Sequence, residues 1–366
     1  MLGVACSAIA FTSYGPWATA QTIINVPPQF APSTVPADTI VNLLDGGSLG
    51  GTVALAGSQV KILGGTGSYV TGRAGSLLTM SGGLMSTSLY VEGMLDFAGG
   101  RTNRLTINSG HAEISGGAFG SLVANLGSSV ELQGVGFRVN GADLAGLSSP
   151  GDALALNLAD DDILTGVLAD GTAFVVWQFG QIRNGTLTLV QSAAPAFGPA
   201  ETIVVSTNST LARVTQGQTL VLAEGARLPE YFRAGNGSTV EINGGYLPDK
   251  TQVIGGDVVV NSGGIGYEVE FYDGSNLAIH GGRVNQTWLF RGATLEMDGG
   301  EFAGRAYDGA SVNVTDSTAL YLEMESGSTA TISGGRTSQI SGTGAVHITG
   351  GRHAYFSMTG SSMLIE

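Results

Sequence analysis

Three acidic residues recur at one position of a repeating pattern. Asp96, Glu113 and Glu131 each stand three residues before a glycine pair or its degenerate copy. If successive repeats stack, these carboxylates lie about 5 Å apart in one row. At that spacing they would bind Ca²⁺ or act as a pair on a sugar; the alternative is a solvated acidic stripe. We treat them as candidate cation ligands, with Ca²⁺ as the only cofactor considered.

Asp160, Asp161 and Asp162 form the densest acidic run of the chain. They are further cation candidates, and a polar turn is the alternative, since the ligand spacing of an EF-hand loop is absent. The four histidines do not share one repeat position, so their spacing does not predict a metal site. These are His111, His280, His347 and His353.

The familiar catalytic motifs are missing from the sequence, and no catalytic residue is assigned. "GGTGSYVTG" (64–72) is glycine-rich but lacks the lysine of a phosphate-binding loop. Lys61 occupies the same repeat position as Asp96, but two repeats earlier, which separates a basic group from the carboxylates that a polysaccharide lyase would combine with it. The pattern therefore favours a non-enzymatic protein over an enzyme.

The element that positions these residues is a repeat of about 18 residues that ends in Gly-Gly. The glycine pairs begin at positions 46, 64, 82, 99 and 116, with a degenerate copy at 134–136, and again at 244, 263, 281, 299, 334 and 350, with a degenerate copy at 316–317. A fixed period of this length indicates a solenoid.

Each repeat contains one short strand with a buried face. Apolar residues stand two and four positions before Gly-Gly, as Leu95 and Phe97 do before Gly99. A Gly seven positions before the pair marks a turn. Stacked repeats would pair in a parallel ladder, which single repeats cannot do alone. We predict an all-β protein, a right-handed parallel β-helix in two arrays separated by a small β insert. Apolar residues do not recur every six positions, which disfavours the left-handed form.

The repeat stops near Phe137 and resumes near Thr219. Between them, short alternating segments with Gly, Asn and Asp turns predict an antiparallel β unit that acts as a cap or spacer. Phe174, Trp177 and Phe179 would give it a compact core. The predicted organisation is a signal peptide at 1–20, a leader at 21–37, a first array at 38–136, an insert at 137–218 and a second array at 219–366.

The composition of the chain limits the classes of partner that it can bind. The 366 residues include 59 Gly and carry a net charge of −14, which disfavours nucleic acid and anionic lipid. No stretch of about 20 apolar residues remains to span a membrane once the N-terminal segment is set aside. That segment is apolar and ends in Ala18-Thr19-Ala20, which fits a signal-peptidase site although a basic start is missing. We therefore expect a secreted or cell-surface protein.

The sequence resembles a family. "TIVNLLDGGSLG", the "GSxVxIxGG" coils and "LTGVLADGTAF" followed by "GTLTLV" are similar to glycine-rich secreted β-helix repeat proteins, autotransporter-passenger-like solenoids predicted in planctomycete-type bacteria. The resemblance covers most of residues 38–366. It implies an extracellular β-helix and supplies no catalytic residues. The family's second cap block is missing here, so we expect a truncated chain or a stacking contact after Glu366.

These observations lead to a functional expectation. We expect a secreted, non-enzymatic β-solenoid that serves as an extracellular or cell-surface structural or adhesive module. Its partners would be extracellular polysaccharide or another solenoid chain, bound through many weak, evenly spaced contacts. The alternative is a polysaccharide lyase or glycoside hydrolase on the same fold.

Overall fold

The computed structural model describes residues 21–177, 182, 185–195, 197, 199–360 and 362–366. They form an all-β solenoid of parallel sheets with about 18 residues per coil, which confirms the predicted parallel β-helix in two arrays with a small β insert. The predicted signal peptide and Phe179 lie outside the described residues. The described residues contain no helix with the length and apolar character needed to cross a membrane.

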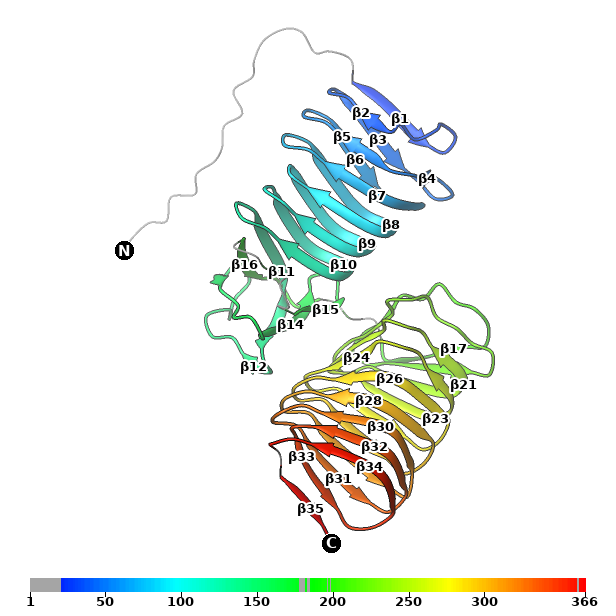
Figure 1. Cartoon of the computed structure of the whole chain (residues 1–366). Coiled ribbons are helices and arrows are strands. Elements are labelled where there is room, and N and C mark those ends of the chain that lie inside the picture. The colour runs from blue at the N-terminus through cyan, green and yellow to red at the C-terminus, as the bar shows by residue number, and fades with distance from the viewer. Residues whose placement is uncertain (1–20, 178–181, 183–184, 196, 198, 361) are drawn as a thin grey trace.

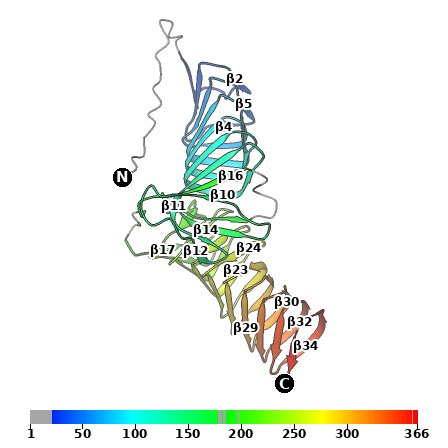
Figure 2. The same ribbon diagram turned by 90° about the vertical axis from the view of Figure 1, so that its left-hand side faces the viewer.

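The strands belong to two sheets that follow each other along the molecule (Figures 1 and 2). The 16-stranded sheet contains β1 (Thr22–Val26), β2 (Thr34–Val35), β3 (Thr39–Leu43), β4 (Ser48–Leu49), β5 (Thr52–Ala54), β6 (Gln59–Ile62), β7 (Thr66–Gly72), β8 (Leu77–Val91), β9 (Met94–Ile107), β10 (His111–Ala124), β11 (Ser129–Val139), β12 (Ala142–Asp143), β13 (Ala153–Leu156), β14 (Ile163–Leu168), β15 (Ala173–Trp177) and β16 (Thr186–Gln191). The 19-stranded sheet contains β17 (Glu201–Val205), β18 (Arg213–Val214), β19 (Gln218–Ala223), β20 (Arg233–Ala234), β21 (Thr239–Leu247), β22 (Gln252–Ile254), β23 (Asp257–Ile265), β24 (Val269–Tyr272), β25 (Asn276–Ile279), β26 (Arg283–Leu289), β27 (Thr294–Met297), β28 (Glu301–Ala306), β29 (Ser311–Thr315), β30 (Thr318–Met324), β31 (Thr329–Ser333), β32 (Arg336–Gly342), β33 (Ala345–Ile348), β34 (Arg352–Met358) and β35 (Met363–Ile365). We call β1–β11 with β16 the first array, β12–β15 the insert, and β17–β35 the second array.

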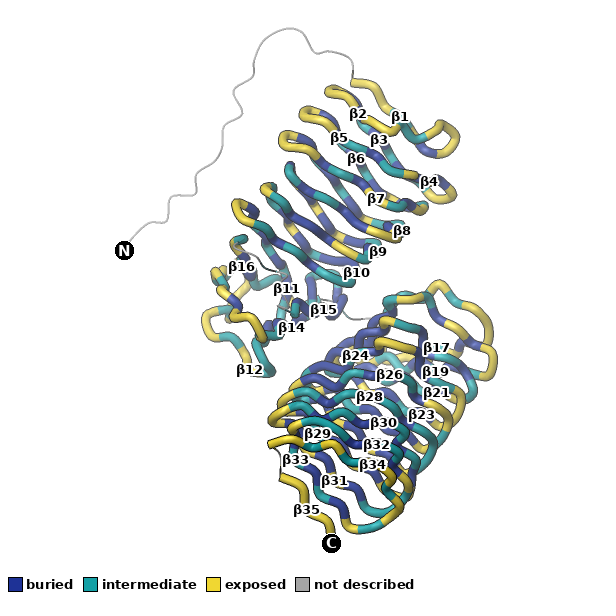
Figure 3. Tube along the Cα trace, in the orientation of Figure 1, coloured by how far each residue is buried: buried dark blue, intermediate teal, exposed yellow. Residues whose placement is uncertain are grey.

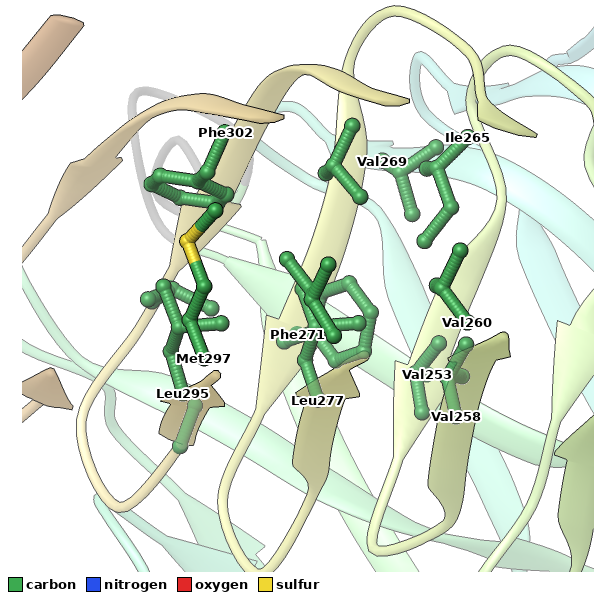
Figure 4. Packing of buried hydrophobic residues seen from close by; sticks show 14 of the residues in the cluster. Val253, Val258, Val260, Ile265, Val269, Phe271, Leu277, Leu295, Met297 and Phe302 are labelled. Carbon is green, nitrogen blue, oxygen red and sulfur yellow. The ribbon is translucent and has the colours of Figure 1, made fainter. Parts of the chain in front are cut away.

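Each array is held together by in-register stacking of equivalent positions. Leu277 of β25 pairs with Leu295 of β27, and Ile279 pairs with Met297. Buried and exposed residues alternate along the strands (Figure 3), so the inward side chains of successive coils form one continuous apolar core (Figure 4). The burial that a single coil cannot achieve is therefore supplied by its neighbours.

The Gly-Gly corners need glycine for two separate reasons. A Cβ on Gly99 would lie 2.5 Å from the backbone oxygen of Ser81 in the preceding coil. Gly100 has a φ of 78°, which side chains with a Cβ rarely adopt. The first glycine thus permits close stacking of coils, and the second turns the chain.

The segment predicted to be a leader, 21–37, is instead the first coil. β1 pairs in parallel with β3, and β2 pairs with β5. Val26 and Val35 are buried in the core of the first array. The prediction was wrong because the segment turns through proline-containing loops and has no Gly-Gly corner to mark it as a repeat.

The insert is a small antiparallel unit, as predicted. β14 and β15 form an antiparallel hairpin, and β14 also pairs antiparallel with β11. β16 pairs in parallel with β11 and so adds one step to the first array. β13 pairs antiparallel with β16, and it therefore covers the edge of that ladder.

The aromatic residues of the insert do not form a core of their own, contrary to prediction. Phe174 belongs to the core of the first array, where it packs near Phe119 and Phe137. Trp177 meets Phe290 of the second array in an edge-on contact, with ring centroids 5.0 Å apart. One side of the insert completes the core of the first array, and the other packs with residues of the second array in a small cluster apart from that array's core.

The second array begins at Glu201 rather than at 219. β17 pairs in parallel with β19 over five positions, from Glu201 with Gln218 to Val205 with Leu222. The prediction missed this coil because it too lacks a glycine pair.

Candidate functional site

The structure brings the predicted acidic row together. Glu113 is the ladder partner of Asp96 on one side and of Glu131 on the other. Asp96 and Glu113 are exposed, and Glu131 accepts a hydrogen bond of 2.7 Å from Gln133. His111 lies 3.5 Å from the Glu113 carboxylate. The row is a line of carboxylates on an outward sheet face, which is the spacing predicted from the sequence.

The other predicted site residues are dispersed. Asp162 accepts hydrogen bonds of 2.7 Å from the backbone of Ala159 and from the Asn140 amide, which is the role of a turn residue. Asp160 and Asp161 are exposed in the same turn. Lys61 is separated from Asp96 by the coil that carries Thr79. Within the described part of the chain, no group of three or more His, Cys, Asp or Glu side chains is placed to hold a metal ion.

A further surface, which was not predicted from the sequence, lies on the less regular side of the second array. It is the outward side of β20, β22, β24, β26, β28 and β30, and we call it the Trp288 face. Inward neighbours such as Val253, Phe271 and Leu289 are fully buried, so the residues between them point outward. One outward row runs through Arg233, Gln252, Glu270, Trp288, Arg305 and Glu323.

A second outward row, two residues further along each strand, is aromatic. Tyr272, Phe290 and Tyr307 stack with their planes nearly parallel and successive ring centroids 4.7 Å apart. Trp177 of the insert meets the edge of this stack. Stacking at one ladder step fixes the rings and makes the face rigid.

Three linked hollows lie on and beside the Trp288 face. The first has a volume of about 200 Å³ and is lined by Lys250, Glu268, Glu270 and Trp288, with Asn103 and Ser121 of the first array as a wall. The second, of about 180 Å³, is shared by Trp288, Arg305, Tyr321 and Glu323. The third, of about 680 Å³, lies between the second array and the insert, where Arg305, Tyr307 and Glu325 face Trp177 and Asp161. Trp288 connects the first two hollows, and Arg305 connects the second and third.

The Trp288 side chain is fixed by packing on one of its sides. It packs against the buried cluster that includes Ile254, Tyr272 and Phe290, and its remaining surface lines two hollows. An aromatic side chain fixed in this way offers a large contact surface at little cost in conformational entropy.

Glu270 stands beside Trp288 on the side of the first array. Its Oε2 accepts hydrogen bonds of 2.8 Å from Gln252 and from the Tyr272 hydroxyl. Desolvation of the carboxylate raises the pKa of Glu270, and this outweighs the hydrogen bonds and the nearby Arg233, which favour the ionised form. Burial, with Glu270 as neighbour, likewise raises the pKa of Tyr272.

Glu323 occupies the matching position beyond Arg305. Its Oε2 accepts hydrogen bonds of 2.6 Å from Arg305 and 2.8 Å from the Tyr321 hydroxyl. Partial burial lowers the pKa of Arg305, but the bonds to Glu323 and Tyr307 outweigh it and raise that pKa overall. Burial, together with the bond to Glu323, raises the pKa of Tyr321. Arg305 therefore stays protonated and paired with the Glu323 carboxylate.

One signal in the sequence points to this face. Glu270, Trp288, Arg305 and Glu323 follow each other at the 17- or 18-residue period of the Gly-Gly corners, as do Tyr272, Phe290 and Tyr307. The period aligned on the glycines predicts the rows. It does not predict the first and third hollows, because part of their walls comes from the first array and from the insert. Comparison with protein-family models, with curated proteins and with solved structures finds no match to this chain.

Proposed function

We propose that this protein is a secreted or cell-surface β-solenoid that binds polysaccharide and serves as a non-enzymatic structural or adhesive module. The observation that carries the proposal is the placement of Trp288 between two hollows, with Glu270 on one side and Arg305 and Glu323 on the other. The location outside the cell rests on the cleavage-like sequence at Ala18–Ala20.

A polysaccharide fits the chemistry of this face. Sugar rings present apolar C–H surfaces to an aromatic side chain and hydroxyl groups to carboxylates and amides, and the Trp288 face offers both in two adjoining hollows. Linked hollows on a rigid ladder suit an extended ligand whose units repeat.

The separation of Glu270 and Glu323 argues against joint catalysis by these two residues. They are three ladder steps apart, which corresponds to ~14 Å between backbones. Glycosidases place their two carboxyl groups about 5–9.5 Å apart. One observation supports a hydrolase as the second candidate: Glu268 and Glu270 are two residues apart and line the same hollow.

The test is a combined binding and turnover screen with acidic and neutral polysaccharides. We expect the protein to be retarded in native gels that contain a polysaccharide it binds. Trp288→Ala should reduce the affinity measured from this retardation about tenfold or more. Tyr69→Ala, at an exposed aromatic residue of the first array, is the matched control and should leave retardation unchanged. Release of reducing or unsaturated ends would replace the binding module with an enzyme, and absence of retardation by every polymer would refute the proposal.

A further inference from the structure

We infer that the Trp288 face binds a neutral glycan. The hydroxyl groups of the glycan would donate hydrogen bonds to one free carboxylate oxygen on each side of the indole, from Glu270 and from Glu323. The inference rests on the proposed function and concerns the class of polysaccharide. It is drawn from the charges that line the three hollows and from the atoms that remain free to bond.

The guanidinium groups around the hollows are already paired. Arg305 bonds Glu323 at 2.6 Å and lies 3.9 Å from Glu325. Arg291 is paired with Asp308. A uronate would have to displace a carboxylate from one of these groups to gain a bidentate contact, and would leave that carboxylate unpaired.

Lys250 does not supply a free cation inside the hollows. Its ammonium group donates a hydrogen bond of 3.3 Å to the Tyr231 hydroxyl and lies 5.4 Å from the centre of that ring. The residue is exposed at the rim of the first hollow, with Glu268 lining the same hollow. One exposed ammonium beside a carboxylate attracts a polyanion weakly.

The lining as a whole is acidic. Six carboxylates line the hollows against three cations, so the net charge is −3 when all are ionised. The carboxylates are Asp161, Glu268, Glu270, Asp308, Glu323 and Glu325, and the cations are Lys250, Arg291 and Arg305. The whole chain carries a net charge of −14, so an anionic polymer is repelled both at a distance and in the hollows.

Glu270, one ladder step from Trp288, and Glu323, two steps away on the other side, each have a carboxylate oxygen that can accept hydrogen bonds. Both protein donors to Glu270 bond its Oε2, and both protein donors to Glu323 also bond Oε2. In the described part of the chain, no donor bonds Oε1 of either residue. A neutral sugar brings hydroxyl donors to these oxygens, whereas an ionised uronate brings another acceptor.

The experiment is isothermal titration with cellohexaose, laminarihexaose and mannohexaose, and with hexagalacturonate, at low and high NaCl. We expect at least one neutral hexaose to bind with an affinity that changes less than twofold with salt, and hexagalacturonate to bind at least tenfold more weakly. Trp288→Ala should abolish measurable binding, and Trp288→Phe, which keeps a ring and fills the site, should retain part of it. Tyr69→Ala should match the wild type.

Three other results of these titrations would each contradict a different part of the proposal. Binding of hexagalacturonate with a steep loss in salt would overturn the neutral class and leave polysaccharide binding standing. Binding of a neutral hexaose that Trp288→Ala does not weaken would move the site elsewhere. Failure of every oligosaccharide, together with failure of every polymer in the native gels, would overturn the proposed function itself.

Discussion

The guanidinium of Arg233 donates a hydrogen bond of 2.6 Å to the backbone oxygen of Ala173, across the junction between the second array and the insert. The same group bonds the backbone oxygen of Phe119 in the first array and lies 5.3 Å from the centre of that ring. Arg233 is 2% exposed, and this burial lowers its pKa to about 10, so it stays charged at neutral pH. One buried cation thus ties all three parts of the chain together.

Removal of this cation should loosen the junction. Arg233→Met keeps the apolar stem but removes the donor that bonds two carbonyl groups, which we expect to cost about 2–4 kcal/mol. Urea unfolding followed by the fluorescence of Trp177 and Trp288 measures it, because both side chains contact the junction cluster. Arg336→Met, at an exposed position of β32, is the control. Equal midpoints for the two variants would show that Arg233 does not couple the arrays.

Glycines with left-handed backbones should differ in their sensitivity to substitution according to what lies beside them. Gly100 and Gly127 both have left-handed backbones, but a Cβ on Gly100 would lie 2.4 Å from the oxygen of Gly82, while Gly127 has open space. We expect Gly127→Ala to cost about 1–2 kcal/mol from backbone strain alone, and Gly100→Ala to cost clearly more. Thermal unfolding of both variants compares them. Similar losses would mean that the coils can move apart to admit a methyl group.

The acidic row should be a source of repulsion when no cation is bound. Glu113→Gln removes the middle charge between Asp96 and Glu131 and should stabilise the first array by about 0.3–1 kcal/mol at low salt. Glu296→Gln is the matched control, since its ladder neighbours are Ala278 and Asn313. Melting curves with and without Ca²⁺ decide between the two interpretations of the row. If the Glu113 variant is less stable than the wild type only when Ca²⁺ is present, the row is a cation site.

The sequence predicted the features that recur in most coils. Gly-Gly and the apolar pair before it mark one strand and one corner in each coil, so the ladder register of Asp96, Glu113 and Glu131 follows by counting. Degenerate corners obey the same physics: Asp316 adopts a φ of 50° where other coils use glycine. Local geometry of this kind depends on a few neighbouring residues, and it is therefore visible in the sequence.

What the sequence did not predict depends on parts of the chain that have no fixed spacing. The first coil and the coil at Glu201 turn without glycine pairs, so counting misses both. The first hollow beside Trp288 needs Asn103 and Ser121, which lie far away in the chain and reach it only through the packing of the two arrays. The insert likewise brings Trp177 to Phe290 by tertiary packing that no local pattern encodes.

The raised pKa of Glu270 predicts a specific dependence of stability on pH. A carboxyl group whose folded pKa lies above its ordinary value of 4.5 stabilises the fold below that value, and this contribution is lost as the pH rises through the folded pKa. Glu270→Gln cannot ionise, and its amide retains the shape and an acceptor for Gln252 and Tyr272. The free energy of unfolding of this variant, relative to wild type, should therefore increase from about pH 4 upward and level off once Glu270 is ionised in the folded protein. Urea titrations at a series of pH values measure the difference, with the exposed Glu296→Gln as a control that should show a smaller trend. A flat difference would mean that the hollow beside Trp288 hydrates Glu270 as well as water does, and a difference that falls with pH would mean that the hydrogen bonds from Gln252 and Tyr272 outweigh desolvation.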